Sequence, residues 1–170
     1  HDDDMRWLIA LISDTGMRLG EAAGLERSHV DLSAELPHLI IEETGNRRLK
    51  TKTSKRRIPL VGEALWAARK AVEASLHNNT SFLFPRYNKQ ASTNSNSASN
   101  GLNKWMKEHI PSHYVLHGFR HAMRDRLREV DCPSDVMDEI GGWSKSSVGQ
   151  TYGQGLSLER LYRYMEKVVI

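Results

Sequence analysis

The chain has 170 residues and a formal net charge of +3. Hydrophobic residues make up 39% of it and charged residues 26%, a balance that is typical of a folded globular chain and excludes a disordered one. No apolar run approaches the roughly 20 residues that a membrane-spanning helix needs, so we expect no membrane partner. A chain of this length buries one sizeable core, which predicts a single domain over residues 1–170.

The N-terminus and the cysteine content indicate the setting of the protein. The chain begins with His1 and not with Met, which predicts that it is a fragment of a longer protein. Acidic residues follow at positions 2–4, whereas a signal peptide begins with positive charge. Cys132 is the only cysteine, which excludes an internal disulfide and favours a packed thiol over a nucleophile. We therefore expect a cytoplasmic protein.

The first part of the chain predicts two helices and then a small sheet. Helical spacing predicts a helix over residues 2–12, a break at 13–16, and a second helix that starts near Met17 or Arg18 and ends by Gly24. A turn is expected at residues 28–31, followed by a β-branched strand at 38–42 and a turn at 44–46. Second and third short strands are expected in the basic residues that follow, ending at 57–60.

The remainder of the chain predicts mostly helices. A helix over residues 62–76 is expected to bury the stripe Leu65, Ala68, Val72 and Leu76. After a short buried segment at 82–85, residues 88–100 are almost wholly small and polar, which predicts a flexible loop without chemistry. Further helices are expected at residues 102–109, 117–130, 134–140 and 157–169. The predicted fold class is mainly α with a small antiparallel β-sheet (α+β).

A strongly basic stretch lies between positions 47 and 57. It contains no acidic residue and seven bases, which are Arg47, Arg48, Lys50, Lys52, Lys55, Arg56 and Arg57. A solvated surface is the usual explanation of a charge run, but this density exceeds what solubility needs. The stretch therefore favours binding to a phosphate backbone.

Four separated segments carry groups that suit one phosphate. They contain Arg18 with Glu21 one helical turn later, a lysine of the basic stretch, the pair His117 and Arg120, and finally Trp143 and Tyr152. Each segment alone has a structural explanation, such as a surface ion pair or a buried aromatic pair. Together they supply donors for a pentavalent phosphate and a phenol that can attack it. No acidic or Cys/His cluster predicts a metal, and metal-free phosphoryl transfer needs such a cationic cage.

The ordered set of these residues resembles the active site of the tyrosine recombinases, the phage-integrase family. The set comprises Arg18, Lys52, His117, Arg120, Trp143 and Tyr152. Arg18 lies in a Thr-Gly-x-Arg-x-Gly-Glu block, the basic stretch resembles the family's β-hairpin, and Trp143 precedes Tyr152 by the family's interval. Most members carry His where Trp143 stands, and the common Leu-Gly before it is Gly141-Gly142 here. Lys50 and Lys55 compete with Lys52 for the lysine position.

The resemblance implies a mechanism without cofactor, metal or ATP. Tyr152 would attack a DNA phosphate and form a 3′-phosphotyrosyl bond, releasing a 5′-hydroxyl. Arg18 and Arg120 would clamp the non-bridging oxygens, His117 would act as base, and Lys52 would protonate the leaving oxygen. Trp143 would donate to the phosphate or pack against Tyr152, with Glu21 orienting Arg18 or Lys52. The implied fold is the tyrosine recombinase catalytic domain.

The resemblance also implies partners and a biological role. Double-stranded DNA is the expected partner, and a homotetramer on DNA is the expected assembly. The C-terminal helix, within residues 155–170, would fold back on its own domain or be exchanged between protomers. A separate N-terminal DNA-clamping domain is absent from this chain, and the preferred role is integration or excision of a phage or genomic island. The alternatives are a non-catalytic DNA-binding module, a type IB topoisomerase-like enzyme and a helical interaction domain.

Overall fold

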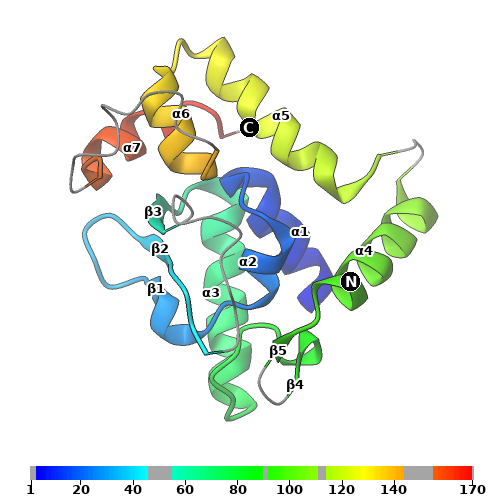
Figure 1. Cartoon of the computed structure of the whole chain (residues 1–170). Coiled ribbons are helices and arrows are strands. Elements are labelled where there is room, and N and C mark those ends of the chain that lie inside the picture. The colour runs from blue at the N-terminus through cyan, green and yellow to red at the C-terminus, as the bar shows by residue number, and fades with distance from the viewer. Residues whose placement is uncertain (1–2, 46–54, 90–91, 111–113, 144–154, 170) are drawn as a thin grey trace.

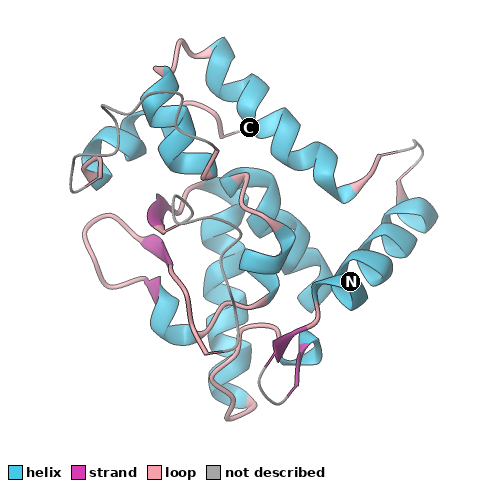
Figure 2. Ribbon diagram, in the orientation of Figure 1, coloured by secondary structure: helices cyan, strands magenta, loops and turns pink. Residues whose placement is uncertain are grey.

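The computed structural model describes residues 3–45, 55–89, 92–110, 114–143 and 155–169. Helices dominate, and the strands are short segments beside them (Figures 1 and 2). The predicted fold class, mainly α with a small antiparallel sheet, is confirmed. The elements are α1 (Asp4–Thr15), α2 (Leu19–Ala23), η1 (Arg27–His29), β1 (Val30–Asp31), β2 (His38–Ile41), β3 (Arg56–Pro59), α3 (Gly62–His77), η3 (Pro85–Tyr87), β4 (Asn88–Lys89), β5 (Ser92–Thr93), α4 (Ser95–His109), α5 (Leu116–Glu129), α6 (Ser134–Gly141) and α7 (Leu158–Met165).

Helix α1 lies at the centre of the molecule, packed against α3 and α5 (Figure 1). Asp3 caps its start, because the carboxylate accepts a hydrogen bond from the backbone N–H of Arg6 at 3.1 Å. The helix ends at Thr15 and not at residue 12, because Gly16 first adopts the left-handed conformation, with φ of 63°. This end fixes the short connection that leads to Arg18.

Helix α3 approaches α1 through its alanines. Ala64, Ala67, Ala68 and Ala71 are buried, whereas Leu76 is 61% exposed. The prediction that Leu76 is buried is therefore wrong. The buried face of α3 is rotated about the helix axis relative to the predicted stripe. Small side chains let two helix backbones approach closely, and the sequence pattern alone favours the larger residues instead.

The sheet runs in the order β1-β2-β3 and is antiparallel. Leu39 of β2 pairs with Ile58 of β3, and both side chains are fully buried. The segment expected as a turn at residues 28–31 forms η1 and then β1, so β1 supplies an outer strand of this sheet. Of the two strands expected through the basic stretch, the last is found as β3, and residues 46–54 lie outside the described part of the chain.

The polar segment at 88–100 is structured wherever it is described, so the prediction of a flexible loop is wrong there. β4 and β5 pair as a hairpin, and α4 begins at Ser95. The Asn94 side chain caps this helix by accepting from the backbone N–H of Ser97 at 2.9 Å. Ala98, Leu102 and Met106 form its buried stripe, at a spacing of four residues.

Helix α7 folds back onto its own chain. Its residues Leu158, Leu161 and Met165 are buried where it packs on β3 and α6. The apolar face that the sequence left unassigned is therefore covered within one protomer. Among the described residues, no helix combines the length and the apolar character that crossing a membrane requires.

Candidate active site

Arg18 is held at the start of α2 by Glu21. Its Nη1 donates to Glu21 Oε1 at 3.1 Å, and its backbone N–H donates to Glu21 Oε2 at 2.8 Å. Its Nη2 donates to the carbonyl oxygen of Gly142 at 2.9 Å. The Arg18 side chain remains 26% exposed. Glu21 thus orients this guanidinium while part of it stays accessible to an anion.

Arg56 is the buried second partner of Glu21. Its Nη1 and Nη2 donate to the two Glu21 carboxylate oxygens at 3.1 and 2.9 Å, and its Nε donates to the carbonyl oxygen of Ile140 at 3.0 Å. The Arg56 side chain is 1% exposed. The prediction that Arg56 contacts the DNA backbone is therefore corrected, because a guanidinium enclosed in this way does not reach a phosphate on the surface.

His117 and Arg120 lie three residues apart on one face of α5. His117 is exposed near the start of the helix, and Arg120 is buried one turn later. Arg120 Nη1 donates to the carbonyl oxygen of Gly16 at 2.6 Å, and its Cζ lies 4.8 Å from the ring centroid of Trp143. The loop after α1 and the second residue after α6 thus fix the same guanidinium.

A cavity of about 350 Å³ joins these elements. Arg18, His117 and Arg120 all line it, together with Ser99 and Asn103 of α4. The structure therefore brings together three of the six predicted catalytic residues around one space. Trp143 lies beside them through its contact with Arg120.

Asn103 is a part of this cavity that the sequence interpretation missed. Its Oδ1 accepts a hydrogen bond from the backbone N–H of Leu116, the first residue of α5, at 3.0 Å. Its Nδ2 donates to Ser99 Oγ at 3.2 Å. The helical spacing of Ala98, Leu102 and Met106 was the available signal that this polar segment is a helix. Asn103 links α4 to the end of α5 that carries His117.

Replacing Asn103 by Ala is expected to lower the free energy of unfolding by about 1 kcal/mol, because the α5 N-terminus loses its side-chain acceptor. Replacing Asn100 by Ala is the matched control, since Asn100 is exposed on the same helix and the change should stay within about 0.5 kcal/mol. Urea unfolding of both variants measures the difference. Equal stabilities would contradict the role of Asn103.

Several predicted residues lie outside the described part of the chain. These are Arg47, Arg48, Lys50, Lys52 and Tyr152. Lys55 is exposed, and its Nζ lies 3.9 Å from Glu42 Oε2. Arg57 is exposed on β3, and because successive strand residues point to opposite faces, it faces away from the Glu21 side that Arg56 occupies. Contact of Lys55 and Arg57 with the DNA backbone stays a prediction.

The charge around Arg120 is strongly unbalanced. Burial lowers the pKa of Arg120 to about 10, the positive charge of Arg18 adds to this effect, and Glu21 opposes it. Arg56 and Arg124 lower it further. Among the described residues that shift this pKa, three are arginines and one is a carboxylate, Glu21, so positive charge exceeds negative charge around Arg120. A partly buried cluster with this excess of positive charge favours an anion.

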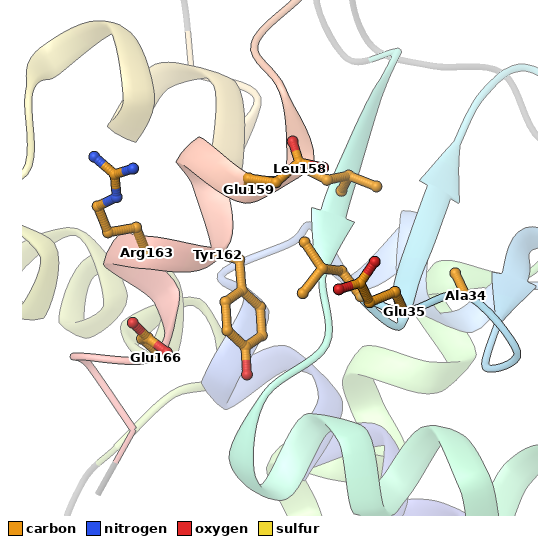
Figure 3. Close-up of a pocket in the computed structure, with 8 residues that line it drawn as sticks. Ala34, Glu35, Leu158, Glu159, Tyr162, Arg163 and Glu166 are labelled. Carbon is orange, nitrogen blue, oxygen red and sulfur yellow. The ribbon is translucent and has the colours of Figure 1, made fainter.

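A second cavity of about 450 Å³ lies between α7 and the connection from β1 to β2 (Figure 3). Tyr162 contributes from the α7 side and Glu35 from the side of the connection. None of its lining residues belongs to the predicted catalytic set. In the part of the chain that is described, no group of three His, Cys, Asp or Glu side chains is placed to hold a metal ion.

Comparison with known proteins gives a family match. The model of the phage integrase family matches residues 3–157 of the chain. No curated protein sequence matches it.

Solved structures share the fold at low sequence identity. The Tn1549 transposon integrase in complex with transposon right end DNA is 20% identical, with a TM-score of 0.53 over 94% of this chain and 57% of that one. The XerH site-specific recombinase bound to palindromic difH substrate is 20% identical, with a TM-score of 0.57 over 84% and 39%. The XerA recombinase is 18% identical, with a TM-score of 0.57 over 96% and 62%. The chain thus spans between 39% and 62% of these proteins.

Proposed function

Because this chain belongs to the phage integrase family, we propose that it is the catalytic domain of a site-specific DNA recombinase that cleaves and rejoins strands through a 3′-phosphotyrosyl intermediate. The neighbouring structures that were solved with DNA support double-stranded DNA as the partner. Integration or excision of a phage or genomic island is the proposed role, and a homotetramer on DNA is the proposed assembly. Exchange of the C-terminal helix between protomers is not part of the proposal, because α7 packs on β3 and α6 of its own chain.

One observation carries the proposal. Arg18, His117 and Arg120 come from two helices far apart in the sequence and line a single cavity, with Glu21 holding Arg18 in place. Two guanidiniums can bind the non-bridging oxygens of one phosphate, and an imidazole beside them can accept a proton. A non-catalytic DNA-binding surface needs the cations but does not need the imidazole inside the same cavity.

The proposed reaction is a transesterification at one phosphodiester of the DNA backbone. The Tyr152 oxygen forms a bond to phosphorus, the bond from phosphorus to the 5′-oxygen breaks, and the electron pair leaves with that oxygen. His117 accepts the phenol proton, and Lys52 donates a proton to the 5′-oxygen. Arg18 and Arg120 stabilise the charge that develops on the phosphate. Rejoining is the reverse reaction with a 5′-hydroxyl of a partner strand, so the bond energy is conserved.

Trapping on nicked suicide duplexes tests this proposal. Duplexes tiled over the DNA that flanks the gene would be incubated with the protein, and covalent adducts would be resolved under denaturing conditions. The proposal expects adducts on a subset of duplexes, with a free 5′-hydroxyl as the second product. DNA binding without adducts on every duplex would favour a non-catalytic module. Relaxation of supercoiled plasmid without recombinant products would favour a topoisomerase.

A further inference from the structure

The ring of Trp143 lies close to two arginines of α5. The Cζ atom of Arg120 is 4.8 Å from its centroid, and that of Arg124 is 5.3 Å away. Both distances fall within the roughly 6 Å over which a guanidinium is attracted to an aromatic face. Indole binds cations better than phenyl, and partial burial strengthens the attraction. One ring therefore contacts two like-charged groups.

Gly141 provides the space for this ring. A Cβ atom added at Gly141 would lie 2.2 Å from the ring atoms Cε3 and Cζ3 of Trp143. No real side chain fits at that distance. Trp143 can therefore occupy its position only because residue 141 is glycine.

The two arginines have different additional partners. Arg120 Nη1 donates to the carbonyl oxygen of Gly16, which fixes one end of the guanidinium. Arg124 Nε is buried and has no hydrogen-bond partner among the described residues. The Trp143 ring is thus a contact of Arg124 and a second constraint on Arg120. Without the ring, the hydrogen bond to Gly16 would be the one that Arg120 keeps among the described residues, and its guanidinium would regain rotational freedom about it.

We propose that Trp143 is a positioning residue, whose ring, seated on Gly141, holds the guanidinium of Arg120 toward the cavity and places Arg124 as a further cation beside it. The inference rests on the proposed function for its catalytic consequence and replaces direct donation to the phosphate as the main role of Trp143. The orientation of Arg120 should affect the rate of strand cleavage in the protein–DNA complex more than the affinity for DNA. The affinity is shared among many phosphate contacts, whereas the rate depends on the geometry at one phosphate.

The first test measures the single-turnover rate of adduct formation at saturating DNA on a suicide duplex that the wild type cleaves. Trp143→Ala is expected to lower this rate by about 100-fold with DNA affinity within about threefold, because Arg120 loses its orientation. Trp143→Phe retains a ring face and should lose no more than about 10-fold. Trp66→Ala is the matched control, since Arg6 lies over the Trp66 ring at 4.9 Å and this pair does not line the cavity. Its rate should stay within about twofold, as expected for a site without a role in the reaction.

The second test uses the contact with Gly141. Gly141→Ala should lower the cleavage rate as Trp143→Ala does, and the double variant should be no slower than Trp143→Ala alone, since the displaced ring is then absent. A Phe variant as slow as the Ala variant would show that the indole N–H is required and would overturn the proposal. A Gly141→Ala protein that cleaves at the wild-type rate would also overturn it.

The third test needs no DNA and separates this inference from the proposed function. In the NMR spectrum of the wild type, the side-chain protons of Arg120 and Arg124 should be shifted upfield by the Trp143 ring. Trp143→Ala should abolish both shifts, and Trp143→Phe should retain them in part. Absence of these shifts in the folded wild type would overturn the inference even if the protein cleaves DNA. A wild type with the shifts but without adducts on any duplex would count against the proposed function alone.

Discussion

Replacing Tyr152 by Phe is expected to abolish covalent protein–DNA adducts. The phenol oxygen is the proposed nucleophile, and Phe keeps the ring while removing only that oxygen. Loss of a nucleophile lowers turnover by at least about 10⁴-fold in well-studied enzymes, since no other group supplies the missing bond. DNA affinity should stay within about threefold of the wild type, because the phosphate contacts made by the arginines remain.

Tyr162→Phe is the matched control for this change. Tyr162 is half-buried on α7 and lines the second cavity, away from Arg18 and Arg120. Its variant should form adducts at the wild-type rate. Denaturing gels of suicide-duplex reactions measure both variants, and a filter or gel-shift assay at one fixed salt concentration measures affinity. Persistent adducts with the Tyr152 variant would show that another side chain is the nucleophile.

Replacing Arg56 by Met is expected to lower the free energy of unfolding by about 3 kcal/mol. Removing one member of a buried ion pair leaves the other without compensation and costs about 3–5 kcal/mol. The lower end applies here because Arg18 still contacts the Glu21 carboxylate. Urea unfolding with an unchanged m-value measures the loss.

Arg57→Met is the control for the Arg56 variant. The two residues are neighbours on β3, but Arg57 is exposed, so its replacement should stay within about 0.5 kcal/mol. If Arg56 instead met the DNA backbone, its variant would keep its stability and reduce the salt dependence of DNA binding. That result would contradict the buried contact with Glu21.

The stability difference made by Arg56 should depend on pH. Burial raises the pKa of Glu21, but the hydrogen bonds and charge of Arg56, together with Arg18, outweigh this and hold the pKa below its usual value. A carboxyl group with a depressed folded pKa contributes stability above its unfolded pKa, about 4.3, and loses that contribution as pH falls through the folded pKa. The gap between wild type and Arg56→Met should therefore narrow as pH falls below about 4. A constant gap between pH 7 and pH 3 would contradict this linkage.

Much of the fold was predictable because local signals and packing agree. The residues around Leu8 and Ile12 have helical spacing, and they are buried in α1. The segment at 88–100 shows the limit of composition, because its Ser and Asn residues predicted a loop, whereas Asn94 caps a helix that begins at Ser95 and buries Ala98. Helix α3 shows a second limit of prediction from sequence. Its packing against α1 decides which of its faces is buried, and the hydrophobic pattern of α3 alone does not contain that information.

The sequence by itself determined the fold class, the family and the set of residue types that suit a phosphate, because spacing and order along the chain carry that information. It did not determine which cations face the site. Arg56 and Arg57 are adjacent and chemically alike, yet the pleat of β3 turns one toward Glu21 and the other toward solvent. Likewise, only the fold brings Trp143, Arg120 and Arg124 together over Gly141. These roles depend on distances between distant segments, and tertiary packing alone sets those distances.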